Sequence, residues 1–295
     1  MFFMAEYALD DGEWVTCEGA PVKEEILRID DICRDQLGWP RRKHNVAQPW
    51  VIEEEAVSHT LHLRWRILSE IACDEIMLAI EDAECLAIRW NGKAVDNTPV
   101  GWYVDKAVKT VKLPGLVPGE NVLEADIPYG KRTDTEWAYL LGDFGVKVLG
   151  GLVQIVEPVK ELAFGNLAMQ GMPFYGGNVT YHIPVETKGG ELTLFAGQYR
   201  GGLMVARVDG GEEIPLVYAP YKVSLGTYPA GTHTIDVTLY GNRRNSFGPI
   251  HFTDLKNIGS DPNKWRTTGE LWSYDYKLKD VGVLSTPVIM EEIMC

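Results

Sequence analysis

Paired cysteines are missing from this sequence. Its five cysteines (Cys17, Cys33, Cys73, Cys85 and Cys295) are odd in number, widely spaced and form no CxxC motif. A disulfide framework or a zinc ribbon needs cysteines paired at short, regular spacing. We therefore expect buried free thiols and neither of those architectures.

Basic residues are also scarce. The chain carries 28 Lys and Arg against 42 Asp and Glu, which gives a formal net charge of -14 and a pI near 4.9. Binding to phosphate-rich surfaces requires clustered Lys and Arg. The composition therefore argues against nucleic acid and anionic membranes as partners and leaves neutral ligands open.

Long apolar runs are absent as well. No run reaches the roughly 20 residues that span a bilayer. The opening "MFFMAEYALDDGEW" has no basic n-region and carries Glu6 and Asp10 within its apolar stretch, unlike a signal peptide. We expect either a cytoplasmic chain or a fragment of a longer, secreted enzyme.

Helical periodicity is confined to one region. In "VKEEILRIDDICRDQLG", residues 22–38, apolar residues recur at three- and four-residue steps and Gly38 provides a stop. After residue 50 the period becomes two, as in "TLHLRWRI" (60–67), "NVLEADI" (121–127) and "HTIDVTLY" (233–240). This alternation is typical of half-buried strands, and with 45% hydrophobic residues the chain can form one or two cores.

The strand pattern repeats. The segments "IRWNGKAV" (88–95), "WYVDKAVKTVKLP" (102–114) and "LVPGENVLEADIPYG" (116–130) have counterparts, in order, in "ARVDGGEEI" (206–214), "APYKVSLG" (219–226) and "YPAGTHTIDVTLYG" (228–241). Each copy contains an Asn-Gly or Asp-Gly turn, which suits a tight hairpin. The sequence predicts an all-β fold of two tandem antiparallel jelly-roll β-sandwiches, 51–158 and 159–295, after a helical lead, 1–50, that packs on the first sandwich.

This order of turns and strands resembles the galactose-binding-like jelly rolls attached to many glycoside hydrolases. The longer pieces "EEILRIDDICRDQLGWPRR", "AQPW", "YGKRTDTEWAYLLGDFGV" and "QGMPFYGGNVTYHIPV" resemble the C-terminal region of large bacterial glycoside hydrolases of the α-L-rhamnosidase type, family 106. The resemblance covers nearly the whole chain but only the non-catalytic end of that family. It implies that the acid and base residues lie on a preceding barrel.

Composition agrees that the isolated chain is not an enzyme. A (β/α)₈ barrel takes about 250 residues of alternating strand and helix, and one clear helix is present. Acidic pairs such as Glu81-Asp82 are expected to be solvated charges among 42 acidic residues. Ser246, His251 and Asp254 lack the GxSxG elbow of a hydrolase nucleophile.

Metal-binding patterns are not found. His59 and His62 lie at odd separation on a strand and point to opposite faces, and no DxDxDG loop occurs. We predict no cofactor and name no metal ligands. A structural Ca²⁺, common in jelly rolls of the class that the chain resembles, stays open.

Two polar loops follow corresponding strands of the repeat. After "VTLYG" comes "NRRNSFGPIH", and after "DIPYG" comes "KRTDTEW". Loops at a sandwich end are where ligands dock in galactose-binding-like domains. The candidate ligand-binding residues are Tyr199, Asn242, Arg243 and His251 in the second sandwich, and Arg132, Glu136 and Trp137 in the first.

The expected roles follow from sugar chemistry. Tyr199 would stack on a sugar face, Asn242 and His251 would bond hydroxyls, and Arg243 would present a fork to a diol or carboxylate. The alternative is that these polar side chains bond loop carbonyls at a sandwich corner.

Two functions therefore remain. The first is a non-catalytic, ancillary carbohydrate-binding region that binds plant polysaccharide weakly, which calls for a groove with aromatic and convergent polar groups. The second is a structural support that packs against the catalytic domain of a parent enzyme, which calls for a large exposed apolar patch.

Overall fold

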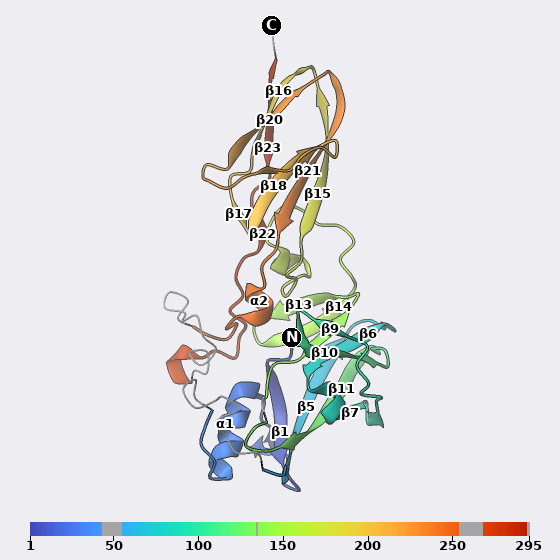
Figure 1. Ribbon diagram of the computed structural model, residues 1–295, viewed down its shortest axis with the longest axis vertical. Helices are drawn as coiled ribbons and strands as arrows, with labels where there is room; N and C mark the ends of the chain where they lie inside the picture. Colours follow the sequence, from blue (N-terminus) through green and yellow to red (C-terminus); the bar gives the residue numbers. More distant parts are fainter. Residues whose placement is uncertain (43–54, 134, 254–267, 294–295) are drawn as a thin grey trace. The chain divides into compact units, whose positions relative to one another are not determined.

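The computed structural model describes residues 1–42, 55–133, 135–253 and 268–293 (Figure 1). The chain divides into two compact units. Unit 1 comprises Met1–Pro158 with Phe252–Tyr274, and unit 2 comprises Val159–His251 with Asp275–Cys295. Each unit therefore combines separate parts of the chain, an interleaving that the contiguous domains predicted from the sequence do not include. The predicted boundary at residue 50 lies outside the described residues.

Unit 1 contains an eight-stranded sheet in the order β13-β14-β5-β11-β7-β8, with β1 paired to β5 and β4 paired to β1. Its strands are β1 (Met4–Leu9), β4 (Glu24–Glu25), β5 (His59–Ser69), β7 (Ala87–Trp90), β8 (Lys93–Ala94), β11 (Gly119–Tyr129), β13 (Gly145–Leu149) and β14 (Leu152–Val156). The pairing of β14 with β5 is parallel, and the others are antiparallel. Because β1 and β4 join this sheet, the segment expected as a helical lead also builds the first sandwich.

Alternation along β5 and β11 sets the core of unit 1. The two strands pair along their whole length, from Gly119 opposite Ser69 to Tyr129 opposite His59. The four apolar residues predicted to face inward from β5 are all buried: Leu61, Leu63, Trp65 and Ile67. The period-two prediction for this strand is therefore confirmed.

A second sheet of unit 1 has the order β12-β6-β10-β9. Its strands are β6 (Ile76–Glu81), β9 (Gly101–Tyr103), β10 (Asp105–Leu113) and β12 (Tyr139–Gly142). Leu78 and Val111 lie opposite each other in the β6–β10 register and are fully buried. The 3-10 turn η2 (Ala83–Cys85) follows β6, and the short hairpin β2 (Thr16–Cys17) and β3 (Ala20–Pro21) precedes β4.

The one long helix, α1 (Ile26–Gln36), is shorter than the predicted span of 22–38. It starts late because Glu24 and Glu25 pair with β1. Glu25 then caps the helix, since its carboxylate accepts the main-chain N–H groups of Leu27 and Arg28 at 3.0 Å each. The buried face carries Ile26, Ile29 and Cys33, as the periodicity requires, and also Asp30 and Arg34.

Unit 2 is built from two sheets with the orders β15-β21-β18-β19 and β20-β16-β23. Their strands are β15 (Val179–Thr187), β16 (Gly190–Phe195), β18 (Leu203–Val208), β19 (Ile214–Pro215), β20 (Lys222–Tyr228), β21 (Gly231–Tyr240) and β23 (Val288–Ile293). A two-stranded pair, β17 (Tyr199–Arg200) with β22 (Gly282–Val283), and the short elements η3 (Leu167–Gln170) and α2 (Arg244–Phe247) complete the unit, while η5 (Gly269–Leu271) lies in unit 1. Buried side chains from both sheets form one core, among them Leu194, Ala206, Leu225 and Val237.

The repeated turns have the same backbone geometry. Asn91 and Asp209 both have φ 49°, followed by Gly92 at 76° and Gly210 at 72°. Two successive residues in the left-handed region define the hairpin turn that Asn-Gly and Asp-Gly pairs favour. The all-β sandwich class predicted from the sequence is thus confirmed.

The expectation of buried free thiols is only partly right. The described cysteines are free, but Cys33 alone is buried, while Cys17 and Cys85 are exposed. Cys17 lies in the short hairpin strand β2 and Cys85 at the end of the 3-10 turn η2. No helix in the described part of the chain is long and apolar enough to cross a bilayer.

Candidate ligand-binding site

A pocket of about 290 Å³ opens at one end of the unit 1 sandwich, and we call it the loop pocket. Its walls come from β5 and β11 of one sheet and β6 of the other, so it lies where the two sheets part. Its apolar wall is formed by Val57, Leu63, Ile80, Leu86, Ile127 and Pro128. Its polar wall is formed by Glu81, Asp82, Arg132, Thr133, Thr135 and Glu136.

Two of the acidic groups stand where β6 ends. Glu81 is the last residue of the strand, and Asp82 turns the chain with φ 49°. Burial, followed by the nearby carboxylates of Asp82 and Asp105, raises the pKa of Glu81. The sequence predicts that Glu81 and Asp82 are ordinary solvated charges. In the folded structure both line the loop pocket.

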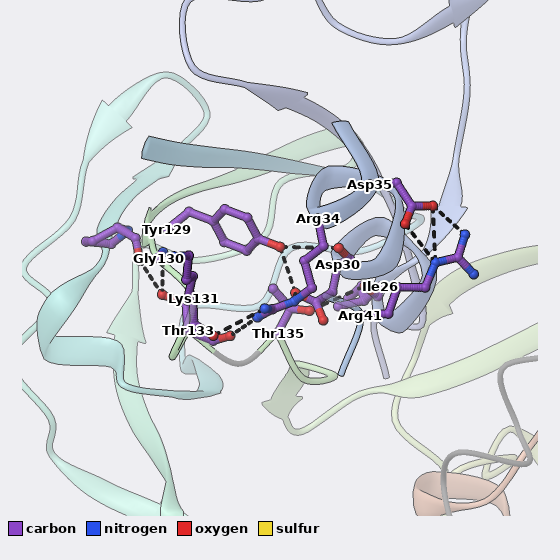
Figure 2. A network of polar contacts seen from close by, with 11 residues as sticks. Ile26, Asp30, Arg34, Asp35, Arg41, Tyr129, Gly130, Lys131, Thr133 and Thr135 are labelled. Carbon is purple, nitrogen blue, oxygen red and sulfur yellow. Dashed lines mark hydrogen bonds and ion pairs between the residues drawn. The ribbon is translucent and has the colours of Figure 1, made fainter. Parts of the chain in front are cut away.

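Arg132, Thr133, Thr135 and Glu136 line the loop pocket, and Tyr129, Lys131, Thr133 and Thr135 contact α1 (Figure 2). Arg34 lies at the centre of this contact, with only 1% of its side chain exposed. Its Nε donates to Asp30 Oδ1 at 2.9 Å, Nη1 to the carbonyl of Lys131 at 3.2 Å, and Nη2 to the carbonyl of Thr133 at 2.9 Å.

Tyr129 closes the same network from the end of β11. Its hydroxyl donates to Asp30 Oδ1 at 2.7 Å and contacts the Asp30 carbonyl at 3.2 Å. Burial raises the pKa of Tyr129, so the phenol stays a donor. A sequence signal for this network existed: Asp30 and Arg34 are one helical turn apart and follow Ile26 on the apolar face of the helix.

Trp137 is fixed on the helix side of the segment. Its ring is 7% exposed, and its indole N–H donates to Glu25 Oε1 at 3.1 Å. The ring centroid lies 4.8 Å from that of Phe3. Trp137 therefore offers no free face for sugar stacking here, whereas its neighbour Glu136 and the nearby Arg132 are exposed and line the pocket.

The candidate residues of unit 2 gather at one end of its sandwich. The register places Tyr240 opposite Leu203, and the Gly202 N–H donates to the Tyr240 carbonyl at 2.7 Å. Tyr199, just before β18, and Asn242, just after β21, therefore belong to the same end. The structure thus brings the Tyr199 and Asn242 segments together but gives their side chains separate partners.

Tyr199 and Asn242 bond neighbouring main-chain groups, whereas Arg243 is exposed. The Tyr199 hydroxyl donates to the Leu216 carbonyl at 3.0 Å, and its ring meets Tyr221 edge-on at 4.9 Å. Asn242 Oδ1 accepts the Arg244 N–H at 3.0 Å, just before α2.

His251 is fully buried, with its ring 4.4 Å from that of Tyr276. A side chain with no exposed surface cannot reach a docked sugar without rearrangement. The aromatic that sequence reasoning missed is Tyr218, which is 83% exposed in the turn next to Leu216. Its signal was the Tyr-Ala-Pro-Tyr run in the sequence, which marks an aromatic turn.

Metal ligands do not gather in the described parts of the chain. Across residues 1–42, 55–133, 135–253 and 268–293, no three His, Cys, Asp or Glu side chains are grouped as a metal site. His59 and His62 bond different carboxylates, Asp10 and Asp126, at 2.7 Å each.

Comparison with known proteins gives no family by sequence. No family model matches the chain, and no curated protein matches it. Among solved structures, it is similar to a rhamnosidase from Novosphingobium sp. PP1Y, with 18% identity and a TM-score of 0.31 over 81% of this chain and 23% of that one. It is also similar to a β-D-mannosidase from Dictyoglomus thermophilum, with 12% identity and a TM-score of 0.26 over 81% of this chain and 30% of that one.

An anti-sigma factor domain-containing protein is a further neighbour, with 11% identity and a TM-score of 0.20 over 63% of this chain and 76% of that one. The chain spans less than a third of either glycosidase. Those two neighbours are glycoside hydrolases, the class that the sequence resembles. Likenesses of this size carry no argument about function.

Proposed function

We propose that the chain is a non-catalytic, carbohydrate-binding region of a glycoside hydrolase and binds plant-type polysaccharide through loops at its sandwich ends. The loop pocket is the observation that carries this proposal. A pyranose has apolar faces and a rim of hydroxyls. The pocket sets an apolar wall that includes Ile80 and Ile127 against acceptors and donors on Glu81, Glu136 and Arg132.

The size of the pocket fits a short sugar segment. Its volume of about 290 Å³ lies at the lower end of ligand pockets. Covering roughly 100 Å² of apolar sugar surface is worth about 2.5 kcal/mol, an affinity near 10 mM before hydrogen bonds are counted. Binding at a single site is therefore weak. Its effective affinity rises when two sites engage one polymer or when the chain is tethered to a catalytic domain.

Unit 2 supplies the second proposed site. Tyr199, Asn242 and Arg243 share its end with the exposed ring of Tyr218. Tyr218 provides the open aromatic face, while Arg243 provides a fork for a diol or a carboxylate. Tyr199 holds the Tyr218 turn through Leu216.

Affinity gels containing rhamnogalacturonan, galactan or arabinan test the proposal. We expect the intact chain to be retarded by at least one of them, and Arg132→Ala to reduce that retardation. Lys147→Ala is the matched control, because Lys147 is an exposed cation on β13 away from the pocket. No retardation of the intact chain at millimolar sensitivity would refute carbohydrate binding.

The same proposal predicts no hydrolysis. The chain should release no product from aryl rhamnosides or galactosides above the rate without protein. Turnover that disappears in Glu136→Gln would show instead that the loop pocket is catalytic.

One observation favours the structural support as a second candidate. Leu149 and Leu152 lie opposite each other at the tip of the β13–β14 hairpin and are 58% and 51% exposed. Exposed apolar pairs of this kind are found where another protein surface docks. If the gels show no sugar binding, an assay of association with a separately produced catalytic domain, using Leu149→Ser with Leu152→Ser, tests this candidate.

A further inference from the structure

We propose that α1 is the positioning element of the loop pocket and that Arg34 is its principal positioning residue. This inference rests on the proposed function, because it concerns how the pocket holds its ligand groups. It gives the first 36 residues a part in ligand binding that neither the repeat nor the strand pattern provides.

The attachments to α1 fall on every second residue of the facing segment. Tyr129, Lys131 and Thr133 are bonded to Asp30 or Arg34. Thr135 Oγ1 contacts the Ile26 carbonyl at 3.5 Å, and Trp137 donates to Glu25. The attachments at Lys131 and Thr133 are main-chain carbonyls, and the Thr133 N–H donates to the Gly130 carbonyl at 3.0 Å, so the backbone turn around Arg132 is itself held against the helix.

The two exposed charges of the loop pocket stand between these attachments. Arg132 lies between Lys131 and Thr133, whose carbonyls are both held by Arg34. Glu136 lies between Thr135 and Trp137. Each ligand-facing residue therefore has an anchored residue on both sides, which limits the directions in which its side chain can leave the backbone.

Arg34 can do this because its guanidinium is planar and has donors along two edges. Its Nε meets Asp30, and its two terminal nitrogens reach the carbonyls of Lys131 and Thr133, on either side of Arg132. A lysine ammonium has its three donors on a single nitrogen and lacks the planar fork that places a separate donor on Asp30 and on each carbonyl. The burial of the pair keeps water from competing for the same carbonyls.

The test replaces the buried pair with a neutral one, Asp30→Asn with Arg34→Gln, so that no buried charge is left unpaired. The matched control is Asp35→Asn with Arg41→Gln, an exposed ion pair between a residue of the same helix and one that follows it in the chain (Figure 2). Both are made in the full chain, alone and combined with Arg132→Ala. Affinity is measured for rhamnogalacturonan, galactan and arabinan oligosaccharides, and hydrogen exchange is followed in residues 129–137.

We expect the buried-pair variant to speed exchange in residues 129–137 by about tenfold and to weaken sugar binding by about tenfold, with the control within about twofold of the parent. In the Arg132→Ala background the buried-pair change should have no further effect on affinity, because its effect on the ligand passes through Arg132. An additive loss in that background would show a general structural role and overturn the inference.

The exchange measurement separates the two proposals. If the intact chain binds none of the sugars, the proposed function fails, while exchange in residues 129–137 still shows whether Arg34 orders the loop. Unchanged exchange in the buried-pair variant overturns the inference whether or not a sugar binds.

Discussion

The strands β11 and β21 end alike, in Tyr129-Gly130 and Tyr240-Gly241, but the loops that follow them are held in different ways. The loop of unit 1 depends on a distant helix, through Arg34 and Glu25. The loop of unit 2 is held by short-range bonds around α2 and by Asn245, whose amide bonds both the N–H and the carbonyl of Lys279.

The two loops also differ in which polar side chains are exposed. In unit 2, Asn245, Ser246 and His251 are buried, and Asn245 bonds the main chain of Lys279. In unit 1, Arg132 and Glu136 are exposed and line a pocket, and residues on either side of each bond to α1 or to Glu25. The repeated strand pattern thus places a loop after β11 and another after β21. The helix α1, which lies outside the repeat, holds the loop after β11.

The largest effect that would test this comparison is the loss of Arg34. We expect Arg34→Met to destabilise unit 1 by about 3–5 kcal/mol, because it leaves Asp30 as a buried charge without its partner. Arg41→Met, which removes an exposed cation from the same region, should cost less than about 1 kcal/mol. Urea midpoints followed by tryptophan fluorescence provide the measurement, and equal costs would contradict the assigned role.

A smaller effect concerns pH. Burial raises the pKa of Glu25 from 4.5 to about 7, although Trp137, Leu27 and Arg28 donate to it. The folded state then binds more protons than the unfolded state between these values, so stability falls as pH rises from about 4.5 to 7, by about 3 kcal/mol.

Glu25→Gln should flatten this slope, because the amide does not ionise. Urea midpoints at pH 4.5, 5.5, 6.5 and 7.5 provide the comparison between parent and variant. Parallel curves for the two proteins would show that Glu25 does not titrate in this range.

Unit 2 has a pH dependence with two parts in its Asp209–His233 pair, whose side chains meet at 2.6 Å: the His233 part has the same direction as that of Glu25, and the Asp209 part has the opposite one. The hydrogen bond from His233 lowers the pKa of Asp209, and that bond to Asp209 raises the pKa of His233. The His233 contribution to stability is present below its unfolded pKa of about 6.5 and is lost as pH rises through the folded value. The Asp209 contribution is lost as pH falls below about 3.8 through its lowered pKa.

An NMR titration of the His233 ring checks this pair. Its midpoint should lie above 6.5 in the parent and return toward 6.5 in Asp209→Asn. If Asp209→Asn leaves the midpoint unchanged, Asp209 does not raise the pKa of His233.

The smallest effect on stability is expected at Tyr218. With 83% of the residue exposed, Tyr218→Ala should change the unfolding midpoint of unit 2 by less than about 0.5 kcal/mol. Tyr199→Ala should cost more, because Tyr199 packs on Tyr221 and bonds Leu216. If Tyr218→Ala still weakens retardation on the sugar gels, unit 2 has a binding face of its own.

The sequence could predict what depends on local periodicity and turn chemistry. Alternation identified β5 and β21, and the Asn91-Gly92 and Asp209-Gly210 turns have the conformation that their residues favour. The pairing of β1 with β5 could not be predicted, because it joins residues more than 50 positions apart. Trp137 is kept away from the pocket by its contacts with Glu25 and Phe3. These residues lie more than 110 positions from Trp137 in the chain, so this too could not be predicted.

The buried Arg34 network also has a consequence for the time course of synthesis. The carbonyls that Arg34 binds follow it by 97 and 99 residues. At about 5–20 residues per second, this separation corresponds to about 5–20 s of translation, during which α1 has been made but the loop that Arg34 binds has not. An 11-residue helix is marginal by itself in water, so Asp30 and Arg34 stay hydrated through that interval and the loop pocket closes only after Trp137 has been made.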